Sequence, residues 1–329
     1  MSSRLLSFVL PVSRHSRDGA DLERMRILLT SFLQFFDLDD LGRFFVVVPR
    51  EEAGLVRDIV KELCADERFL VVSELDICPE LANARDLGGW EKQQLLKLAI
   101  SERVETSHYV TLDADVICVR NFDASSLIVA GRALCGVETM GDYLTLYTHE
   151  FAIRERGLKQ ERVVRTQFVL ETPRPSRYVG RFYSETPVLL ETSVVRSLTA
   201  HIAEHGRKSW TEELIKSPGW TEYALYFQYL ESAGLLEAVH FPSNRNAVLR
   251  LDRSLWHPPS CYPQKGDTKR EDWDGALIEE WDAASAFQPH GDGFFVVLQS
   301  YLKVPAEKIW EKIKPYVPRP AEARSCSHG

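Results

Sequence analysis

Long hydrophobic runs are absent from this chain of 329 residues. The apolar run at residues 5–12 is broken by Ser7 and Pro11, so it lacks the apolar core and the cleavage site of a signal peptide. No other stretch approaches the roughly 20 apolar residues of a membrane-spanning helix. The sequence therefore predicts a cytoplasmic protein, which would have to meet any lipid-linked substrate from the membrane surface.

An excess of positive charge is also absent, because 40 Lys and Arg residues stand against 48 Asp and Glu residues. Proteins that bind nucleic acids usually carry a basic footprint, so no nucleic-acid partner is predicted. The six cysteines form no C-x-x-C pair and match no zinc-module spacing, and several lie inside apolar runs. They are predicted to be reduced core thiols, as suits a cytosolic compartment.

The first half of the chain contains an alternation of strand and helix patterns. Strands are predicted at residues 5–12, 44–48, 69–72 and 109–112, and helices at 21–36, 51–64 and 90–102. This alternation is typical of a mostly parallel sheet with helices on both faces, so the predicted fold class is α/β and Rossmann-like. In the second half, helices are predicted at 142–156, 192–204, 210–216 and 220–232, strands at 133–137 and 294–298, and loops at 243–289. A terminal helix starts at Pro305, and the tail after residue 318 is predicted to be disordered.

The first candidate site is the triplet at residues 113–115, which follows a predicted buried strand. Side chains two apart in extended backbone point the same way, so Asp113 and Asp115 can face one ion. Mg²⁺ and Mn²⁺ commonly bridge such carboxylates to a substrate diphosphate. Open α/β sheets bind ligands beyond the carboxyl ends of their strands, where this triplet and the loop at residues 13–19 are predicted to lie. The alternative is a solvated turn.

The predicted helix at residues 90–102 is apolar except for one polar stripe, which contains Trp90, Gln94, Lys97 and Ser101. Such a stripe on a buried helix needs partners or a cavity, and Lys97 aimed at a diphosphate meets that need. The alternatives for Lys97 are a path to solvent or an ion pair with a buried carboxylate. Arg14, in the loop after the first strand, is a further candidate for contact with phosphate or ribose.

A Pro-Gly turn at residues 218–219 precedes a predicted helix with Glu222 in its first turn. Thr221 or Gly219 is expected to cap this helix, and the helix dipole favours the ionised form of Glu222. An ionised carboxylate at the mouth of a site can act as a general base, and Tyr226 is placed one turn on to orient it. The alternative is a helix-start acid with no further role.

Together these segments resemble the GT-A class of glycosyltransferases. The resemblance rests on the strand-ending Tyr-Val-Thr-Leu-Asp-Ala-Asp of residues 109–115, the Gln-Leu-Leu-Lys-Leu of residues 94–98 and the Thr-Glu-Tyr of residues 221–223. The chain is similar to a bacterial family of uncharacterised GT-A-like proteins, which share the apolar opening, the W-x-x-Q-Q-x-x-K-L helix and the T-E-Y-x-L-Y segment. The similarity covers residues 5–302.

The resemblance implies one GT-A domain over residues 1–304, with a nucleotide-sugar-binding half to residue 140 and an acceptor half from residue 141, and a terminal helix and tail at 305–329. It implies a UDP- or GDP-sugar donor held by Mn²⁺ or Mg²⁺ at Asp113 and Asp115, and a glycan or glycolipid acceptor in bacterial polysaccharide or glycolipid synthesis. Glu222 would then deprotonate the acceptor hydroxyl, with inversion at the anomeric carbon. Many GT-A enzymes supply a further ligand from the end of a late strand, for which this chain offers Gln299, water or His290.

Two other functions compete with this prediction. Haloacid-dehalogenase-type phosphatases also use a strand-ending D-x-D-x-[T/V], but here the fifth residue is Ile117 and no downstream G-D-x-x-x-D pair is found. A nucleotide-sugar-binding protein without turnover would share the same donor site. The terminal helix mixes apolar residues with Lys308, Lys312 and Lys314, so it is expected either to touch an anionic membrane surface or to dock on the domain.

Overall fold

The computed structural model describes residues 5–14, 19–84, 86–171, 181–206, 208–257, 261 and 276–317. Its centre is a five-stranded sheet with the strand order β3-β2-β1-β4-β9. These strands are β1 (Leu6–Pro11), β2 (Leu41–Val48), β3 (Phe69–Ser73), β4 (His108–Thr111) and β9 (Val188–Glu191). Strands β1 to β4 run parallel, and β9 pairs antiparallel with β4. The prediction of an α/β fold with a mostly parallel sheet is confirmed.

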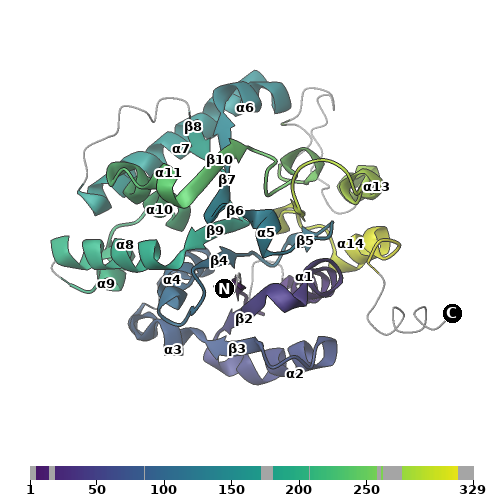
Figure 1. Cartoon of the computed structure of the whole chain (residues 1–329), viewed down its shortest axis with the longest axis horizontal. Coiled ribbons are helices and arrows are strands. Elements are labelled where there is room, and N and C mark those ends of the chain that lie inside the picture. Colours follow the sequence, from purple (N-terminus) through teal and green to yellow (C-terminus); the bar gives the residue numbers. More distant parts are fainter. Residues whose placement is uncertain are drawn as a thin grey trace.

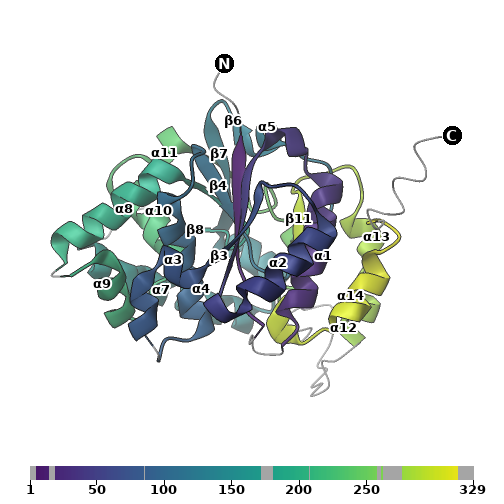
Figure 2. The ribbon, with the colours of Figure 1, turned by 90° about the horizontal axis from the view of Figure 1, so that it is seen from below.

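Helices cover both faces of this sheet (Figure 1, Figure 2). One side carries α1 (Asp21–Phe35), α2 (Ala53–Leu63) and α14 (Ala306–Ile313), and the other carries α4 (Gly89–Ala99), α7 (His149–Leu170), α8 (Thr192–His205) and α10 (Glu222–Ser232). The shorter helices are α3 (Glu74–Ile77), α5 (Ala124–Leu127), α6 (Met140–Leu146), α9 (Trp210–Lys216), α11 (Leu236–Val239), α12 (Ala276–Glu280) and α13 (Ala283–Ala286).

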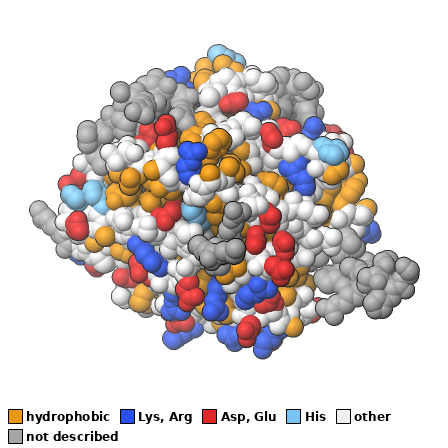
Figure 3. Space-filling view, in the orientation of Figure 1, with side chains coloured by type: hydrophobic (Ala, Val, Ile, Leu, Met, Phe, Trp, Pro, Cys, Tyr) orange, Lys and Arg blue, Asp and Glu red, His pale blue; other side chains and the backbone are white. Residues whose placement is uncertain are grey.

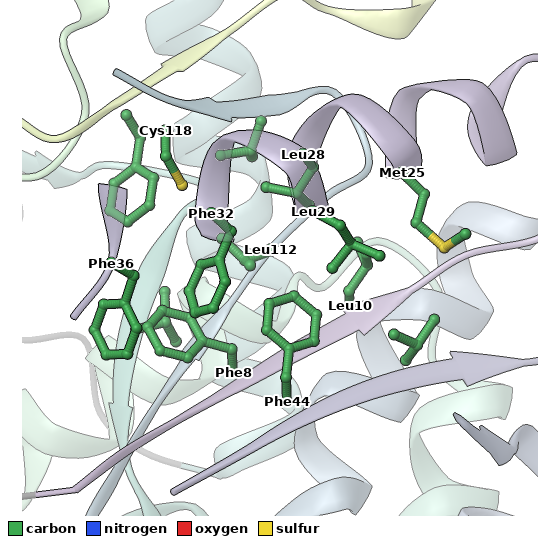
Figure 4. Packing of buried hydrophobic residues seen from close by; sticks show 14 of the residues in the cluster. Phe8, Leu10, Met25, Leu28, Leu29, Phe32, Phe36, Phe44, Leu112 and Cys118 are labelled. Atoms are coloured by element: carbon green, nitrogen blue, oxygen red, sulfur yellow. The ribbon is translucent and has the colours of Figure 1, made fainter. Parts of the chain in front are cut away.

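The core between the sheet and α1 is rich in aromatic rings (Figure 4). Successive side chains of β1 point to opposite faces: Phe8 and Leu10 pack toward α1, whereas Val9 belongs to the apolar cluster under α4 and α10. The ring of Phe32 packs edge-on against Phe8 and Phe44, with centroid distances of 4.7 and 5.0 Å. Burial on both faces explains why β1 is apolar on both faces, except at the buried Ser7, rather than alternating between apolar and polar residues.

Two smaller sheets extend the framework. β7 (Arg132–Thr139) pairs parallel with β10 (His240–Asn244) and antiparallel with β6 (Ile128–Val129) and β8 (Arg181–Tyr183). β5 (Val116–Cys118) pairs antiparallel with β11 (Phe295–Val297). The strand predicted at residues 294–298 therefore exists, and its pairing brings the following residues beside the turn between β4 and β5.

The second half differs from the sequence prediction in several places, and the loops predicted at residues 243–289 contain α12 and α13. Residues 188–191 form β9 at the edge of the central sheet, although the sequence predicts only the helix that follows them. The single helix predicted at residues 142–156 is two helices, because Thr148 leaves the helical conformation and its side chain caps α7 at Phe151 N. The sequence of α7 contains no proline to stop it, and it continues to Leu170.

The terminal helix α14 docks on the domain. Ile309 and Ile313 are buried in one apolar cluster with residues of β5 and β11, which is the docked alternative of the sequence prediction. Contact with a membrane surface stays a prediction, and the tail after residue 318 lies outside the described residues. In the described part of the chain, no helix is long and apolar enough to cross a bilayer.

The surface carries charges of both signs, in agreement with the composition. On the face shown in Figure 3, basic and acidic side chains are intermixed around α2 and β3. Cys64, Cys78 and Cys118 are free cysteines, and Cys78 and Cys118 are buried, in agreement with the prediction of reduced core thiols.

Candidate active site

A cleft of about 960 Å³ lies at the carboxyl ends of β1 and β4. Its lining includes the turn after β4, the starts of α4 and α10, one face of α7 and the residues that follow β11. Parallel strands place their carboxyl ends at one edge, and this is where open α/β sheets bind ligands. The fold therefore brings together segments that are far apart in the sequence.

Asp113 and Asp115 lie in the turn between β4 and β5, and both line the cleft. Asp115 is buried, and its Oδ2 accepts a hydrogen bond from Ser300 N at 2.8 Å. Its Oδ1 is also buried and has no hydrogen-bond partner among the described residues. Burial, followed by the charge of Asp113, raises the pKa of Asp115 to about 7. The negative charge of Asp115 is therefore poorly compensated by its surroundings.

Lys97 projects from the buried face of α4 and is fully engaged with protein acceptors. Its Nζ donates to Asp113 Oδ1 at 2.7 Å, to Glu222 Oε1 at 3.0 Å and to Tyr223 OH at 3.2 Å. An ammonium group has three donors, so these acceptors satisfy it. Burial lowers the pKa of Lys97, but Asp113, Tyr223 and Glu222 raise it well above its ordinary value, so Lys97 stays charged. The ion pair is the alternative that the sequence left open, and contact with a diphosphate stays a prediction.

Glu222 is the first residue of α10, and Thr221 caps this helix by accepting a hydrogen bond from Ala224 N. Glu222 is only 4% exposed. In the amide orientation that satisfies both neighbours, Gln94 donates from Nε2 to Glu222 Oε2 at 3.1 Å and to Trp220 O at 3.2 Å. Burial raises the pKa of Glu222, although Lys97 lowers it in part. The carboxylate is therefore held at two oxygens by two residues of α4.

The prediction that Tyr226 orients Glu222 is wrong. The hydroxyl of Tyr226 accepts from Glu191 N at 2.9 Å and lies 2.8 Å from His240 Nε2, so it is engaged with residues of β9 and β10 and not with Glu222. Tyr223 is the tyrosine near Glu222, and its hydroxyl lies 3.0 Å from Thr111 Oγ1. The helical spacing of one turn was compatible with contact, but β9 and β10 supply Tyr226 with other partners.

We call Asp113, Asp115, Glu222 and Lys97 the acidic cluster: two of its carboxylates, Asp113 and Glu222, contact the ammonium group of Lys97, and Asp115 lies beside Asp113. An orphan buried carboxylate oxygen beside a second carboxylate fits a hard, oxygen-preferring cation. Within the described ranges, no group of three or more His, Cys, Asp and Glu side chains is arranged to hold a metal ion. Further ligands would therefore include neutral oxygens. Gln299 lines the cleft next to Ser300, whereas His290 is not among the lining residues.

Arg14 does not line the cleft. Its side chain is exposed, and its backbone N–H donates to Glu52 Oε2 at 2.6 Å. Residues 15–18 of the same loop lie outside the described part of the chain. A contact between Arg14 and a phosphate or ribose stays a prediction.

Residues 3–321 match a family of unknown function, DUF6492. The chain belongs to this family. The expectation of an uncharacterised family is thus confirmed, and no curated protein matches the sequence.

Three glycosyltransferase structures resemble this DUF6492 chain at low identity. Mouse xyloside xylosyltransferase 1, in its apo form, is 13% identical, with a TM-score of 0.47 over 90% of this chain and 98% of that one. The galactosyltransferase LgtC, solved with donor and acceptor sugar analogs, is 13% identical, with a TM-score of 0.45 over 97% and 99%. The bifunctional glycosyltransferase WbbM, in its apo form, is 10% identical, with a TM-score of 0.44 over 98% of this chain and 51% of that one.

Sequence reasoning missed a second charged group that lines the cleft of this DUF6492 chain. Lys159 Nζ of α7 donates to Glu138 Oε2 of β7 at 2.8 Å, and Arg162 Nη1 donates to Glu185 Oε1 at 2.6 Å. We call these four residues the paired cluster. Burial raises the pKa of Glu185, but Lys159 and Arg162 bring it below its ordinary value, so Glu185 is ionised. In the sequence, residues 149–170 have the mixed charge of a solvated helix, and nothing marks the turns that face a cleft.

Proposed function

We propose that this protein is a metal-dependent glycosyltransferase that moves a sugar from a nucleotide-sugar donor to a hydroxyl acceptor. The observation that carries the proposal is the buried, unpartnered Oδ1 of Asp115 beside Asp113, in a cleft at the carboxyl ends of parallel strands. Small-molecule sites usually have volumes of about 300–1,000 Å³, so this cleft has room for a donor and part of an acceptor. The proposed acceptor is a glycan or glycolipid, in bacterial polysaccharide or glycolipid synthesis.

Asp113 and Asp115 would hold Mn²⁺ or Mg²⁺, and Gln299 or water would complete the ligand set. Both ions prefer oxygen ligands and keep several waters or substrate oxygens, which suits a site with two protein carboxylates. When bound, such an ion neutralises the charge that develops on a departing diphosphate. It would also supply the positive charge that Asp115 lacks, since Lys97 contacts only Asp113 and Glu222 among these carboxylates.

Glu222 is the proposed general base for the acceptor hydroxyl. Burial raises the pKa of Glu222 toward the operating pH, and a carboxylate with such a pKa is a stronger base. Lys97 and Gln94 hold its two oxygens, so its position is fixed relative to Asp113. A base on the acceptor side, opposite the leaving diphosphate, gives inversion at the anomeric carbon.

A thermal-shift titration tests the proposal with UDP-, GDP- and dTDP-sugars, each with and without Mn²⁺. A ligand that binds only the folded state stabilises it by about 2.7 kcal/mol at 100 times its Kd. We expect a UDP- or GDP-sugar to raise the melting temperature only when Mn²⁺ is present, and its sugar to be transferred or slowly hydrolysed. Hydrolysis of p-nitrophenyl phosphate without any such shift would support the phosphatase instead, and binding without turnover would support the binding protein.

A further inference from the structure

We infer that the paired cluster, together with Trp90 and Leu158, binds an uncharged sugar ring of the acceptor. This inference rests on the proposed glycosyl transfer and assigns a substrate class to one part of the same cleft. Three features of the cleft support it: an exposed aromatic surface, a balanced set of charges, and a position next to Glu222.

The aromatic surface is Trp90, at the start of α4. Its side chain is 54% exposed although it lines the cleft. The guanidinium of Arg162 lies over the indole, 6.0 Å from the ring centroid, and the same guanidinium is bonded to Glu185. Leu158 lies one turn before Arg162 on α7 and is also exposed into the cleft. Apolar surface and an ion pair are therefore adjacent.

This combination matches the two sides of a pyranose ring. The C–H face of a sugar is apolar and packs on an aromatic ring, and burying that face against Trp90 removes exposed apolar surface from water. Each sugar hydroxyl both donates and accepts. The carboxylate of Glu185 can accept such hydrogen bonds and the guanidinium of Arg162 can donate them. Two neighbouring hydroxyl groups of one sugar can therefore bind to these two side chains.

The charge balance favours an uncharged ligand. Glu138 is paired with Lys159, and Glu185 with Arg162, so the cluster carries no net charge. A phosphate or carboxylate placed here would gain from the two cations but would lie beside the two carboxylates. Like charges brought together at an interface repel each other and so disfavour a charged partner. The uncharged hydroxyl groups of a sugar meet no such repulsion.

The position of the cluster fits an acceptor. A small cavity of about 50 Å³ is lined by Arg162, Glu185 and Tyr223, and Tyr223 is the residue next to Glu222. The charge of Lys97 also lowers the pKa of Glu185, so the paired and acidic clusters are electrostatic neighbours. A ring held on Trp90 and Glu185 is thus near the proposed base.

To test this inference, the binding of the full chain to an array of neutral, sulfated and sialylated oligosaccharides is measured in the presence of saturating UDP or GDP and Mn²⁺. We expect binding to neutral oligosaccharides. The methyl glycoside of the bound terminal sugar is then titrated by saturation-transfer NMR against the wild type and four variants. Glu185→Gln and Trp90→Ala should each weaken binding about tenfold, because one loses a charged hydrogen bond and the other the aromatic surface. Trp90→Phe should retain most of the affinity.

Arg165→Ala is the matched control, because Arg165 belongs to the same helix and is 56% exposed but does not line the cleft. It should leave glycan binding unchanged. Thermal shifts with the nucleotide and Mn²⁺ are measured for every variant. If the wild type shows the nucleotide shift but binds no glycan, binds only charged glycans, or is insensitive to Trp90→Ala and Glu185→Gln, this inference is overturned and the proposed transfer stands. A wild type without any nucleotide shift would remove the proposed function itself.

Discussion

The two charged clusters of the cleft bury charge in different ways. In the acidic cluster, Asp113 and Glu222 share the ammonium group of Lys97, and the third carboxylate, Asp115, has one oxygen without a hydrogen-bond donor among the described residues. In the paired cluster, each carboxylate has its own cation, at 2.8 and 2.6 Å. Buried charges are costly unless they are compensated, so the first cluster favours a further cation more strongly than the second. The difference teaches that one cleft can hold two sites with opposite demands on a ligand.

The largest loss of activity is expected at Asp115, whose negative charge is the least compensated by nearby donors and cations. Asp115→Asn removes one of the two proposed ligands of the ion, so transfer should be abolished while the fold remains. The measurement is the rate of transfer or of donor hydrolysis with Mn²⁺, and the melting temperature reports the fold. Asp58→Asn on the exposed face of α2 is the control and should behave as wild type. Wild-type activity in excess chelator would refute the metal hypothesis.

The second-largest effect on activity is expected at Glu222, the proposed general base in the acidic cluster. Glu222→Gln keeps the shape of the side chain but cannot accept a proton, so kcat should fall by about 10²–10⁴. Binding of donor and Mn²⁺ should change little, because Asp113 and Asp115 are untouched. Single-turnover rates and calorimetric titrations separate the two quantities. A wild-type kcat, or a product that keeps the anomeric configuration of the donor, would rule out Glu222 as the base.

The contrast between the clusters also explains how much the sequence could predict. The central sheet and the Asp113–Asp115 turn follow local patterns, namely apolar runs of strand length and a polar end, and these were predicted. Glu138 and Glu185 lie near α7 only because β7 and β9 are placed by long-range pairing, and β9 itself was missed. The partner of Lys97 was left open for the same reason: Glu222 lies 125 residues away in the sequence.

Removing one lysine from each cluster compares them directly. Lys97→Met leaves the buried Glu222 and the half-buried Asp113 without their cation, so the free energy of unfolding should fall by about 3 kcal/mol. Lys159→Met should cost less, because Glu138 keeps the hydroxyl of Tyr143 as a donor. Chemical denaturation measures both.

Donor affinity gives a second comparison of the two lysines. If Lys97 also contacts the diphosphate, Lys97→Met should weaken donor binding by about 1.5–3 kcal/mol, whereas Lys159→Met should not. In the stability comparison of the preceding paragraph, equal losses of the free energy of unfolding in the two variants would contradict the proposed difference in charge compensation between the clusters. Unchanged donor affinity in Lys97→Met would remove Lys97 from the donor site.

The smallest effect is expected from the protonation of His257, which lies beside the paired cluster. Burial, together with the charges of Lys159 and Arg154, lowers the pKa of His257 to about 4, and the charge of Glu185 opposes this shift. Between its ordinary value of 6.5 and about 4, the unfolded chain therefore binds a proton that the folded chain does not. The contribution of His257 to stability is complete above pH 6.5 and is lost as the pH falls toward 4, by at most about 1.4 kcal/mol per pH unit. His257→Phe keeps the ring packing against Tyr147 and Phe151. Denaturation at pH 7 and pH 5 should show the wild type losing stability relative to this variant, and parallel pH profiles would show that His257 is protonated in the folded protein as readily as in the unfolded one.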